Sequence, residues 1–151
     1  QKFLEQLKYA CFEAYLSCSK ASLRNNKGLE KAWHTAYSND SKDFANKQDQ
    51  FEYDNYYIPI ENALKSLGID LSSRRDCIKG LVCGMANLFG NSGAKRLIKN
   101  SGVTNDLGDK EFVTKLCDYL VSYCPKHYAY GKSYANRYKN EKNDCLRYIT
   151  N

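Results

Sequence analysis

Residues 76–90 read DCIKGLVCGMANLFG, and this stretch decides the fold that the sequence predicts. Its apolar side chains recur at intervals of three and four residues, which is the repeat of one helix face. They are Ile78, Leu81, Val82, Met85 and Ala86. No other predicted helix is as apolar, so we expect this one to be buried at the centre of the domain.

The same spacing of apolar residues predicts helices on both sides of this segment. They are expected at about residues 2–20, 29–37, 41–55, 60–67, 95–101, 109–124 and 132–149. The boundary residues are Ser41 and Asp109 as N-caps, Gly68 and Gly102 as stops, residues 90–93 as a tight corner, and Pro125 as a helix end. No segment alternates with a period of two. The predicted fold is all-α, with about seven to eight helices in a single domain over residues 1–151.

Length and composition fit a folded domain. The chain has 151 residues, 42% of them hydrophobic, and a net charge of +6 from 23 Lys and Arg against 17 Asp and Glu. It is too hydrophobic for a disordered chain. Its longest stretch without charge, residues 80–94, is shorter than the roughly 20 apolar residues of a membrane span, so no spanning helix is expected. Because Gln1 stands in place of an initiator Met, we expect a removed segment or a piece of a longer chain.

The seven cysteines are an odd number, which excludes a fully paired disulfide framework within one chain. Cys11 and Cys18, like Cys117 and Cys124, are seven residues apart on predicted helices, which puts their Cα atoms about 10 Å apart. That is too far for a disulfide. Cys124 with His127 is the only short Cys/His spacing, and nucleotide-binding motifs are missing, so we expect reduced, buried cysteines, no metal and no cofactor.

Tyrosine and basic residues are the other compositional signal. The chain has thirteen tyrosines, and seven of them lie at residues 53–57 and 128–138, among lysines and asparagines. Tyrosine suits sugar rings or unstacked bases, although it also serves in half-buried scaffold positions. The basic residues Arg74, Arg75, Lys95, Arg96 and Lys99 are interpreted as solvated faces, with an anion-binding patch as the alternative.

Three blocks of sequence resemble the lysozyme-like peptidoglycan-degrading domains of phage endolysins, phage tail proteins and spike-associated proteins of bacteria. The blocks are Gln48-x-x-Phe51-x5-Tyr57-x-Pro59, then Gly68-Ile69-Asp70-Leu71-Ser72-x-Arg74 with Ala86-x3-Gly90-x2-Gly93-Ala94, then Arg137-Tyr138-x2-Glu141-x3-Cys145-Leu146. They stand in the order and spacing of that family and cover about residues 30–147. The resemblance implies the helical lobe of a lysozyme-like fold.

The chain departs from the family at positions that bear on activity. The central block of the family carries a Ser and a Gln where this chain has Gly84 and Leu88, and a Tyr-x-x-Arg of the family appears here as Cys117 and Leu120. The glycine-rich hairpin that follows the catalytic glutamate of the family is absent. The resemblance therefore implies that the N-terminal segment with the catalytic acid has been cut off, is supplied by another chain, or has been lost.

From the resemblance we expect a glycosidase, either a lysozyme-like muramidase or a lytic transglycosylase, that cleaves peptidoglycan with its general acid outside this chain. Gln48, Tyr57 and Arg137 are the expected substrate-binding or scaffold residues. Glu141 and Glu52 are the candidate acids if the chain is catalytic by itself. A glycosidase needs one carboxylic acid held protonated beside the scissile oxygen.

The expected partners are peptidoglycan glycan strands and a second chain that carries the catalytic segment. We expect a protein made in a reducing cytoplasm that acts on the bacterial cell wall, either secreted, phage-delivered or virion-associated. The alternative is a non-catalytic helical interaction protein, derived from a lysozyme-like domain, that binds a protein or a polyanion. Leu88 and Leu120, in place of polar groove residues, favour that alternative. Nucleic acid is a third, less favoured partner.

Overall fold

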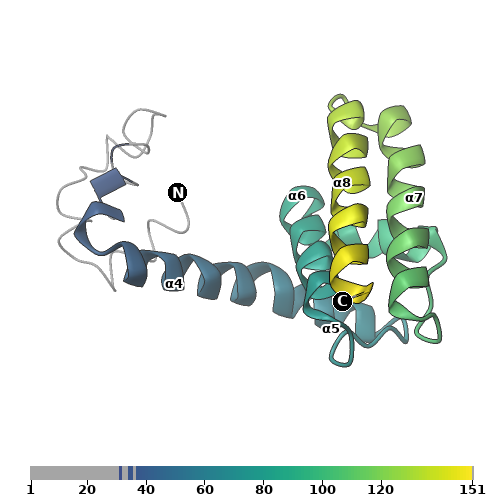
Figure 1. Ribbon diagram of the computed structural model, residues 1–151, viewed down its shortest axis with the longest axis horizontal. Helices are drawn as coiled ribbons and strands as arrows, with labels where there is room; N and C mark the ends of the chain where they lie inside the picture. Colours follow the sequence, from purple (N-terminus) through teal and green to yellow (C-terminus); the bar gives the residue numbers. More distant parts are fainter. Residues whose placement is uncertain (1–30, 32–33, 36, 151) are drawn as a thin grey trace. The chain divides into compact units, whose positions relative to one another are not determined.

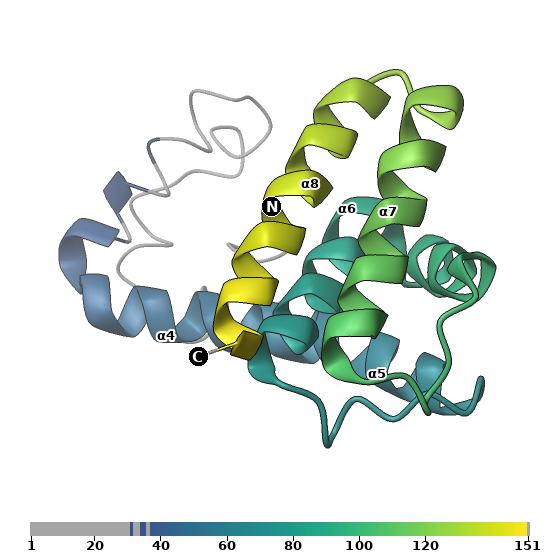
Figure 2. The same cartoon turned by 45° about the vertical axis from the view of Figure 1, so that its right-hand side comes forward.

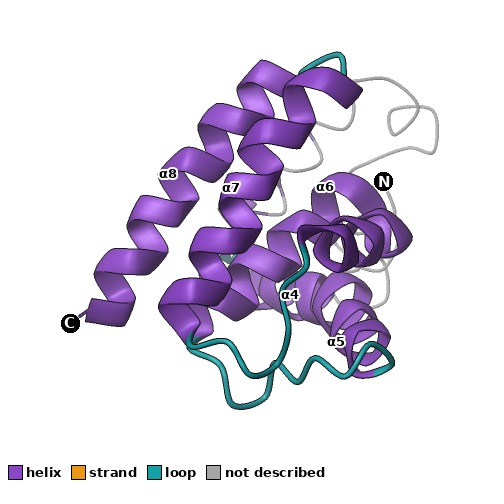
Figure 3. Cartoon of the chain, turned by 90° about the vertical axis from the view of Figure 1, so that its right-hand side faces the viewer, coloured by secondary structure: helices purple, strands orange, loops and turns teal. Residues whose placement is uncertain are grey.

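The computed structural model describes residues 31, 34–35 and 37–150 (Figure 1). Every regular element in this part of the chain is helical (Figure 3). The elements are α4 (Ser41–Glu52), the π-helix η2 (Tyr53–Tyr57), α5 (Ile58–Lys65), α6 (Asp76–Ser101), α7 (Asp109–His127) and α8 (Gly131–Thr150). The all-α prediction is confirmed here. The helix expected at 2–20 and most of that at 29–37 lie outside the described residues, so seven to eight helices and a lysozyme-like lobe stay predictions.

The chain divides into two compact units, Gln1–Glu52 and Tyr53–Asn151, which are described separately. A single domain over residues 1–151 therefore stays a prediction. In the first unit, the Asp40 carboxylate accepts the backbone N–H of Asp43 at 2.9 Å and so caps α4. Ser41, the expected cap, is the first helical residue instead. Phe44 is buried and meets the Tyr37 ring edge-on, with centroids 6.1 Å apart.

The second unit is built around α6, as residues 76–90 predicted. All five apolar residues of the opening stretch are buried, and α6 contacts α5, α7 and α8. Helices α7 and α8 lie side by side as an antiparallel pair joined by a short turn (Figures 1 and 2). None of the helices in the described part of the chain has the length and hydropathy needed to cross a membrane.

Gly90 and Gly102 shape α6 through positive φ angles. Gly90 has φ 72° and ψ 160°, a non-helical conformation that kinks α6 where the corner at 90–93 was expected. The helix resumes directly after the kink, so the corner is one residue wide. Gly102, at φ 70°, ends α6 in the left-handed region, as predicted.

Helix α7 differs from prediction at both ends. Gly108 is its N-cap residue, and no side chain caps this end. Pro125 lies inside the last turn instead of stopping the helix, which continues to His127. Proline removes one backbone donor, but the next turn is held by a hydrogen bond from the Tyr128 N–H to the Cys124 carbonyl at 3.1 Å.

Packing at the turn between α7 and α8 holds the C-terminal end of α7 in place. A Cβ built on Gly131, the first residue of α8, would lie 2.0 Å from the Cys124 carbonyl oxygen and 2.6 Å from the Pro125 Cα. Only glycine allows this approach of the two backbones. The last turn of α7 is therefore held against α8 in spite of its proline.

Arg74 was expected on a solvated basic face, and that prediction is wrong. Its exposed fraction is only 7%. Its guanidinium donates to the Leu107 carbonyl at 2.7 Å, to the Asp109 carboxylate at 3.0 Å and to the Asn105 carbonyl at 3.0 Å. It also lies 4.5 Å over the ring of Phe112. Arg74 thus ties the loop before α6 to the loop before α7, which also explains why Asp109 does not cap its own helix.

Candidate functional site

The candidate site lies where α8 crosses α6, and its centre is the side chain of Arg137. A Cβ built on Gly84 of α6 would lie 2.8 Å from the Arg137 Nη2 atom, so the guanidinium uses the room that this glycine leaves. Arg137 Nε donates to Glu141 Oε1 at 2.7 Å, one helical turn further along α8. Both side chains are only partly covered and remain open to a ligand.

The charge of Arg137 is secured by its partner. Burial acts to lower the pKa of Arg137, but the hydrogen bond and the negative charge of Glu141 outweigh it and raise that pKa. The guanidinium also lies 5.8 Å over the ring of Tyr138. The pair therefore presents fixed donors and acceptors beside an aromatic ring.

Tyr138 is fully buried, and desolvation raises its pKa well above the usual range. Its hydroxyl oxygen has no hydrogen-bond partner within the part of the chain that the structure describes. An unpaired buried hydroxyl costs free energy, so Tyr138 is held in place by its packing. Its ring joins the Arg137–Glu141 pair to the aromatic residues next to it.

These residues form what we call the aromatic cluster: Phe89, Tyr128, Tyr134 and Tyr138. Phe89 is its hub, with ring centroids 5.2 Å from Tyr128, 5.7 Å from Tyr134 and 6.1 Å from Tyr138. Phe89, Tyr128 and Tyr134 are half-buried. Such rings have an apolar face and, in tyrosine, a polar tip, which suits the faces and hydroxyl groups of sugars.

A strip of stacked rings along α7 extends the aromatic cluster. Tyr119 stacks on Tyr123 at 5.3 Å, and Tyr123 stacks on the exposed ring of His127 at 3.7 Å. Tyr123 meets Tyr128 edge-on at 6.3 Å, which links the strip to the cluster. Further along, Lys142 of α8 donates to Asp118 of α7 at 2.7 Å. The strip is therefore linked to the Arg137–Glu141 pair through Tyr128, Phe89 and Tyr138.

Among the expected residues of the second unit, the structure brings Arg137 and Glu141 together. Tyr57 is 9% exposed; its hydroxyl donates to Glu61 at 3.0 Å and its ring stacks on Tyr53 at 5.3 Å. Desolvation, aided by Glu61, raises the pKa of Tyr57 above its usual range. These contacts describe a scaffold residue more than an open ligand contact.

Gln48 and Glu52 lie on α4, in the first unit, whereas the pair and the aromatic cluster lie in the second. Their roles as binding residue and acid stay predictions. Phe89 was missed by sequence reasoning. It stands directly before the kink residue Gly90, and its contacts with the tyrosines of segment 128–138 join positions far apart in the sequence.

The five described cysteines carry thiols. Cys117 and Cys124 are both buried on one face of α7, as their spacing predicted, and desolvation raises the pKa of Cys117 to about 12. Cys11 and Cys18 lie outside the described residues. Within the described ranges, no three His, Cys, Asp or Glu side chains gather as a metal site would require.

Comparison with protein families gives one match. The model of the family described as type VI secretion system spike protein VgrG3-like, C-terminal, matches residues 1–144. No curated protein and no solved structure matches the chain. The match covers nearly the whole chain, including α4 to α7 and most of α8.

Proposed function

This chain belongs to the VgrG3-like C-terminal family of type VI secretion system spike proteins, and from that premise we propose that it binds the glycan strands of peptidoglycan. In this proposal it is the helical part of a lysozyme-like cell-wall hydrolase carried by the spike. The family match supports a part of a spike protein. The resemblance of three sequence blocks to lysozyme-like domains supports the glycan substrate.

The observation that carries the proposal is the Arg137–Glu141 pair seated over Gly84 beside the aromatic cluster. A sugar ring that stacks on the aromatic cluster would lie near charged donors and acceptors, because Arg137 lies over the Tyr138 ring of that cluster. The net charge of +6 would also draw the chain toward the anionic bacterial cell wall. The aromatic rings suit the apolar faces of a sugar, and the charged pair suits its hydroxyl groups.

Glu141 fits a binding role better than that of the general acid. A general acid must present a proton to the scissile oxygen. Glu141 Oε1 instead accepts a charge-assisted hydrogen bond from Arg137 at 2.7 Å. In the resembled family the catalytic glutamate precedes a glycine-rich hairpin that this chain does not carry, so we assign the general acid to a segment or a second chain outside this one.

Cosedimentation with purified insoluble peptidoglycan tests the proposal. Arg137→Ala should weaken binding about tenfold, because a charged hydrogen bond is worth about 1.5 kcal/mol. Arg147→Ala is the matched control, since Arg147 lies on the same helix in an exposed pair with Asp144 and should bind as the unchanged chain does. Equal losses in the two variants would point to net charge alone and would count against the site.

Catalysis is tested by the turbidity of a cell-wall suspension. The purified chain should not clear it, since the acid is assigned elsewhere. Clearing by the chain alone, abolished in Glu141→Gln, would contradict the assignment and make Glu141 the acid.

The second candidate function is a non-catalytic interaction domain that binds another protein. Membership of a spike-protein family favours protein partners. Leu120 is buried in the core, so of the two apolar replacements only the half-buried Leu88 reaches the surface. Absence of peptidoglycan binding together with stable capture by another segment of the spike would favour this alternative. Binding to DNA that falls steeply with added salt would indicate phosphate contacts instead.

A further inference from the structure

Cys77 and Cys145 approach each other where the start of α6 meets the end of α8 (Figure 2). The Cys145 Sγ atom lies 3.5 Å from the Cys77 carbonyl oxygen, and the Cys77 Sγ atom lies 3.9 Å from the Cys145 carbonyl oxygen. Each sulfur therefore lies beside the backbone of the other residue. Reciprocal contacts of this kind bring the two residues close together, and closeness of the two backbones is the first requirement of a disulfide.

From this geometry we infer that Cys77 and Cys145 are a site of covalent modification, at which a disulfide oxidant closes a bond between α6 and α8. The inference does not depend on glycan binding. It concerns two residues that lie 68 positions apart in the chain and that the candidate site does not use.

The two thiols differ in access, which sets the order of steps. Cys77 is half-buried and can meet an oxidant, whereas Cys145 is 5% exposed. Burial, followed by the charge and the hydrogen bond of the Cys77 thiol, raises the pKa of Cys145 to about 12. Since the thiolate is the attacking form, Cys145 is protected from external reagents. Cys77 is the entry point and Cys145 the resolving thiol.

The reaction is a thiol–disulfide exchange with a disulfide of the form RSSR, such as oxidised glutathione. The Cys77 thiolate attacks one sulfur, forming a mixed disulfide and releasing one RS⁻. Cys145 then loses its proton and attacks the Cys77 sulfur, which forms the Cys77–Cys145 bond and releases the second RS⁻. The oxidant is reduced to two RSH, and the two cysteines supply the two electrons. The chain would hold both thiols in a reducing compartment and the bond in an oxidising one.

The consequence is a covalent loop that contains nearly all of α6, all of α7 and most of α8. Closing a loop of this length restricts the unfolded chain, so the oxidised protein should unfold at a temperature about 10 °C higher. Neither the Arg137–Glu141 pair nor the aromatic cluster includes either cysteine. The bond should therefore leave ligand binding unchanged.

The test incubates the full chain with oxidised glutathione, then maps its thiols and disulfides by alkylation, proteolysis and mass spectrometry. The expected result is a peptide pair joined through Cys77 and Cys145, with a higher unfolding temperature that dithiothreitol reverses. Cys77→Ser and Cys145→Ala should each remove both effects. Cys83→Ser changes another half-buried thiol of α6 and should keep them.

Two outcomes would overturn the inference. One is a folded chain that forms no Cys77–Cys145 peptide pair under conditions in which the urea-unfolded chain oxidises. The other is a rise in unfolding temperature that persists in Cys77→Ser, since that rise must then come from another pair of cysteines. Cys77 is half-buried, and serine has nearly the same shape as cysteine, so Cys77→Ser should fold as the unchanged chain does. The test therefore stays valid even if Cys145→Ala folds poorly.

Discussion

The guanidinium of Arg137 rests against Gly84, where a Cβ would come within 2.8 Å of the Nη2 atom. The clash would be with the far end of a flexible side chain, so α6 can accept a side chain there if Arg137 moves away from it. Gly84 thus controls where Arg137 points, and with it the geometry of the Arg137–Glu141 pair. Folding and ligand binding can therefore be separated at this residue.

Gly84→Ala should leave the free energy of unfolding within about 1 kcal/mol of the unchanged chain, because the better helix propensity of alanine offsets the displaced arginine. Peptidoglycan binding should weaken about fivefold as the pair is shifted. Gly80→Ala is the control: it lies on the same helix, and a Cβ there meets nothing within 4 Å. Equal binding by the two variants would show that Arg137 does not depend on the room at Gly84.

Gly131→Ala should destabilise the protein by about 3 kcal/mol or more, because its Cβ would collide with the backbone of Cys124 and Pro125. The midpoint of urea denaturation measures the loss. Gly108→Ala, where a Cβ has no neighbour within 4 Å, should change the midpoint little. A Gly131→Ala protein as stable as this control would mean that α7 and α8 are further apart than the structure has them.

Arg74→Lys should cost about 3 kcal/mol of stability, although it keeps the charge. A lysine cannot reproduce the planar set of hydrogen bonds to Leu107, Asn105 and Asp109, and the buried carbonyl oxygens would lose their donors. The exposed neighbour Arg75 gives the control, and Arg75→Lys should be neutral. Equal unfolding midpoints for the two variants would contradict the buried role of Arg74.

Asp70 should contribute to stability above about pH 4 and lose that contribution below it. Its carboxylate accepts the backbone N–H and the hydroxyl of Ser72, each at 2.9 Å, and these hydrogen bonds lower the pKa of Asp70 from 3.8. A depressed pKa in the folded state means that acid protonates the unfolded chain first, so stability falls as the pH drops. The difference in unfolding free energy between the unchanged chain and Asp70→Asn should therefore shrink between pH 5 and pH 2, as unfolding measured across that range would show. A constant difference would exclude the linkage.

Sequence periodicity predicted the helices of the second unit because their apolar faces are local patterns. The buried face from Ile78 to Ala86 is one example. The two buried cysteines of α7, which are seven residues apart, are another. Arg137 and Glu141 could be placed together for the same reason, since they lie four residues apart on one helix. A left-handed glycine at the end of α6 was likewise visible as Gly102.

Features that depend on contacts between distant segments could not be predicted. Pro125 stays within α7 because Gly131 lets two backbones meet, and Arg74 is buried because a loop some 30 residues away supplies its acceptors. The contact of Gly84 with Arg137 is of the same kind. The sequence showed a glycine at position 84, but it did not show that the Arg137 guanidinium packs against it. Asp40 replaced Ser41 as the cap because the helix begins one residue earlier than expected, at Ser41 itself.

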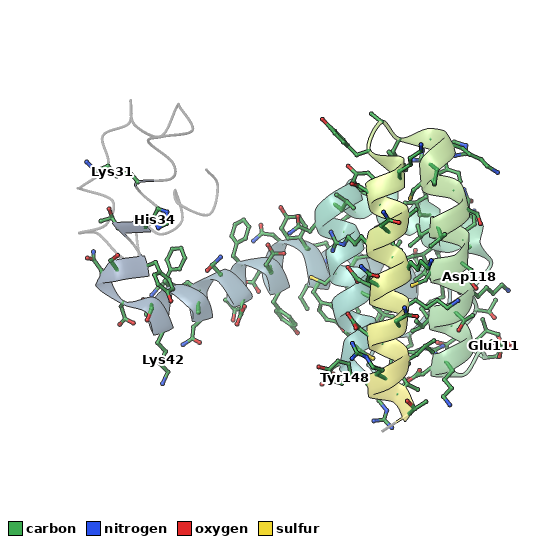
Figure 4. The ribbon with its side chains drawn as sticks, turned by 45° about the horizontal axis from the view of Figure 1, so that its top comes forward. Lys31, His34, Lys42, Glu111, Asp118 and Tyr148 are labelled. Carbon is green, nitrogen blue, oxygen red and sulfur yellow. The ribbon has the colours of Figure 1, made fainter. Side chains whose placement is uncertain are left out.

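The central claim is that the aromatic cluster on α6 and α8 binds cell-wall glycan, and the binding of Tyr134→Leu to purified peptidoglycan tests it most directly. Leucine keeps apolar volume against Phe89 but removes the aromatic face. Tyr148→Leu is the matched control on the same helix, where the tyrosine is 70% exposed and outside the cluster (Figure 4). We predict cosedimentation at least about tenfold weaker for Tyr134→Leu, with Tyr148→Leu unchanged. Equal cosedimentation of both variants with the unchanged chain would contradict the account.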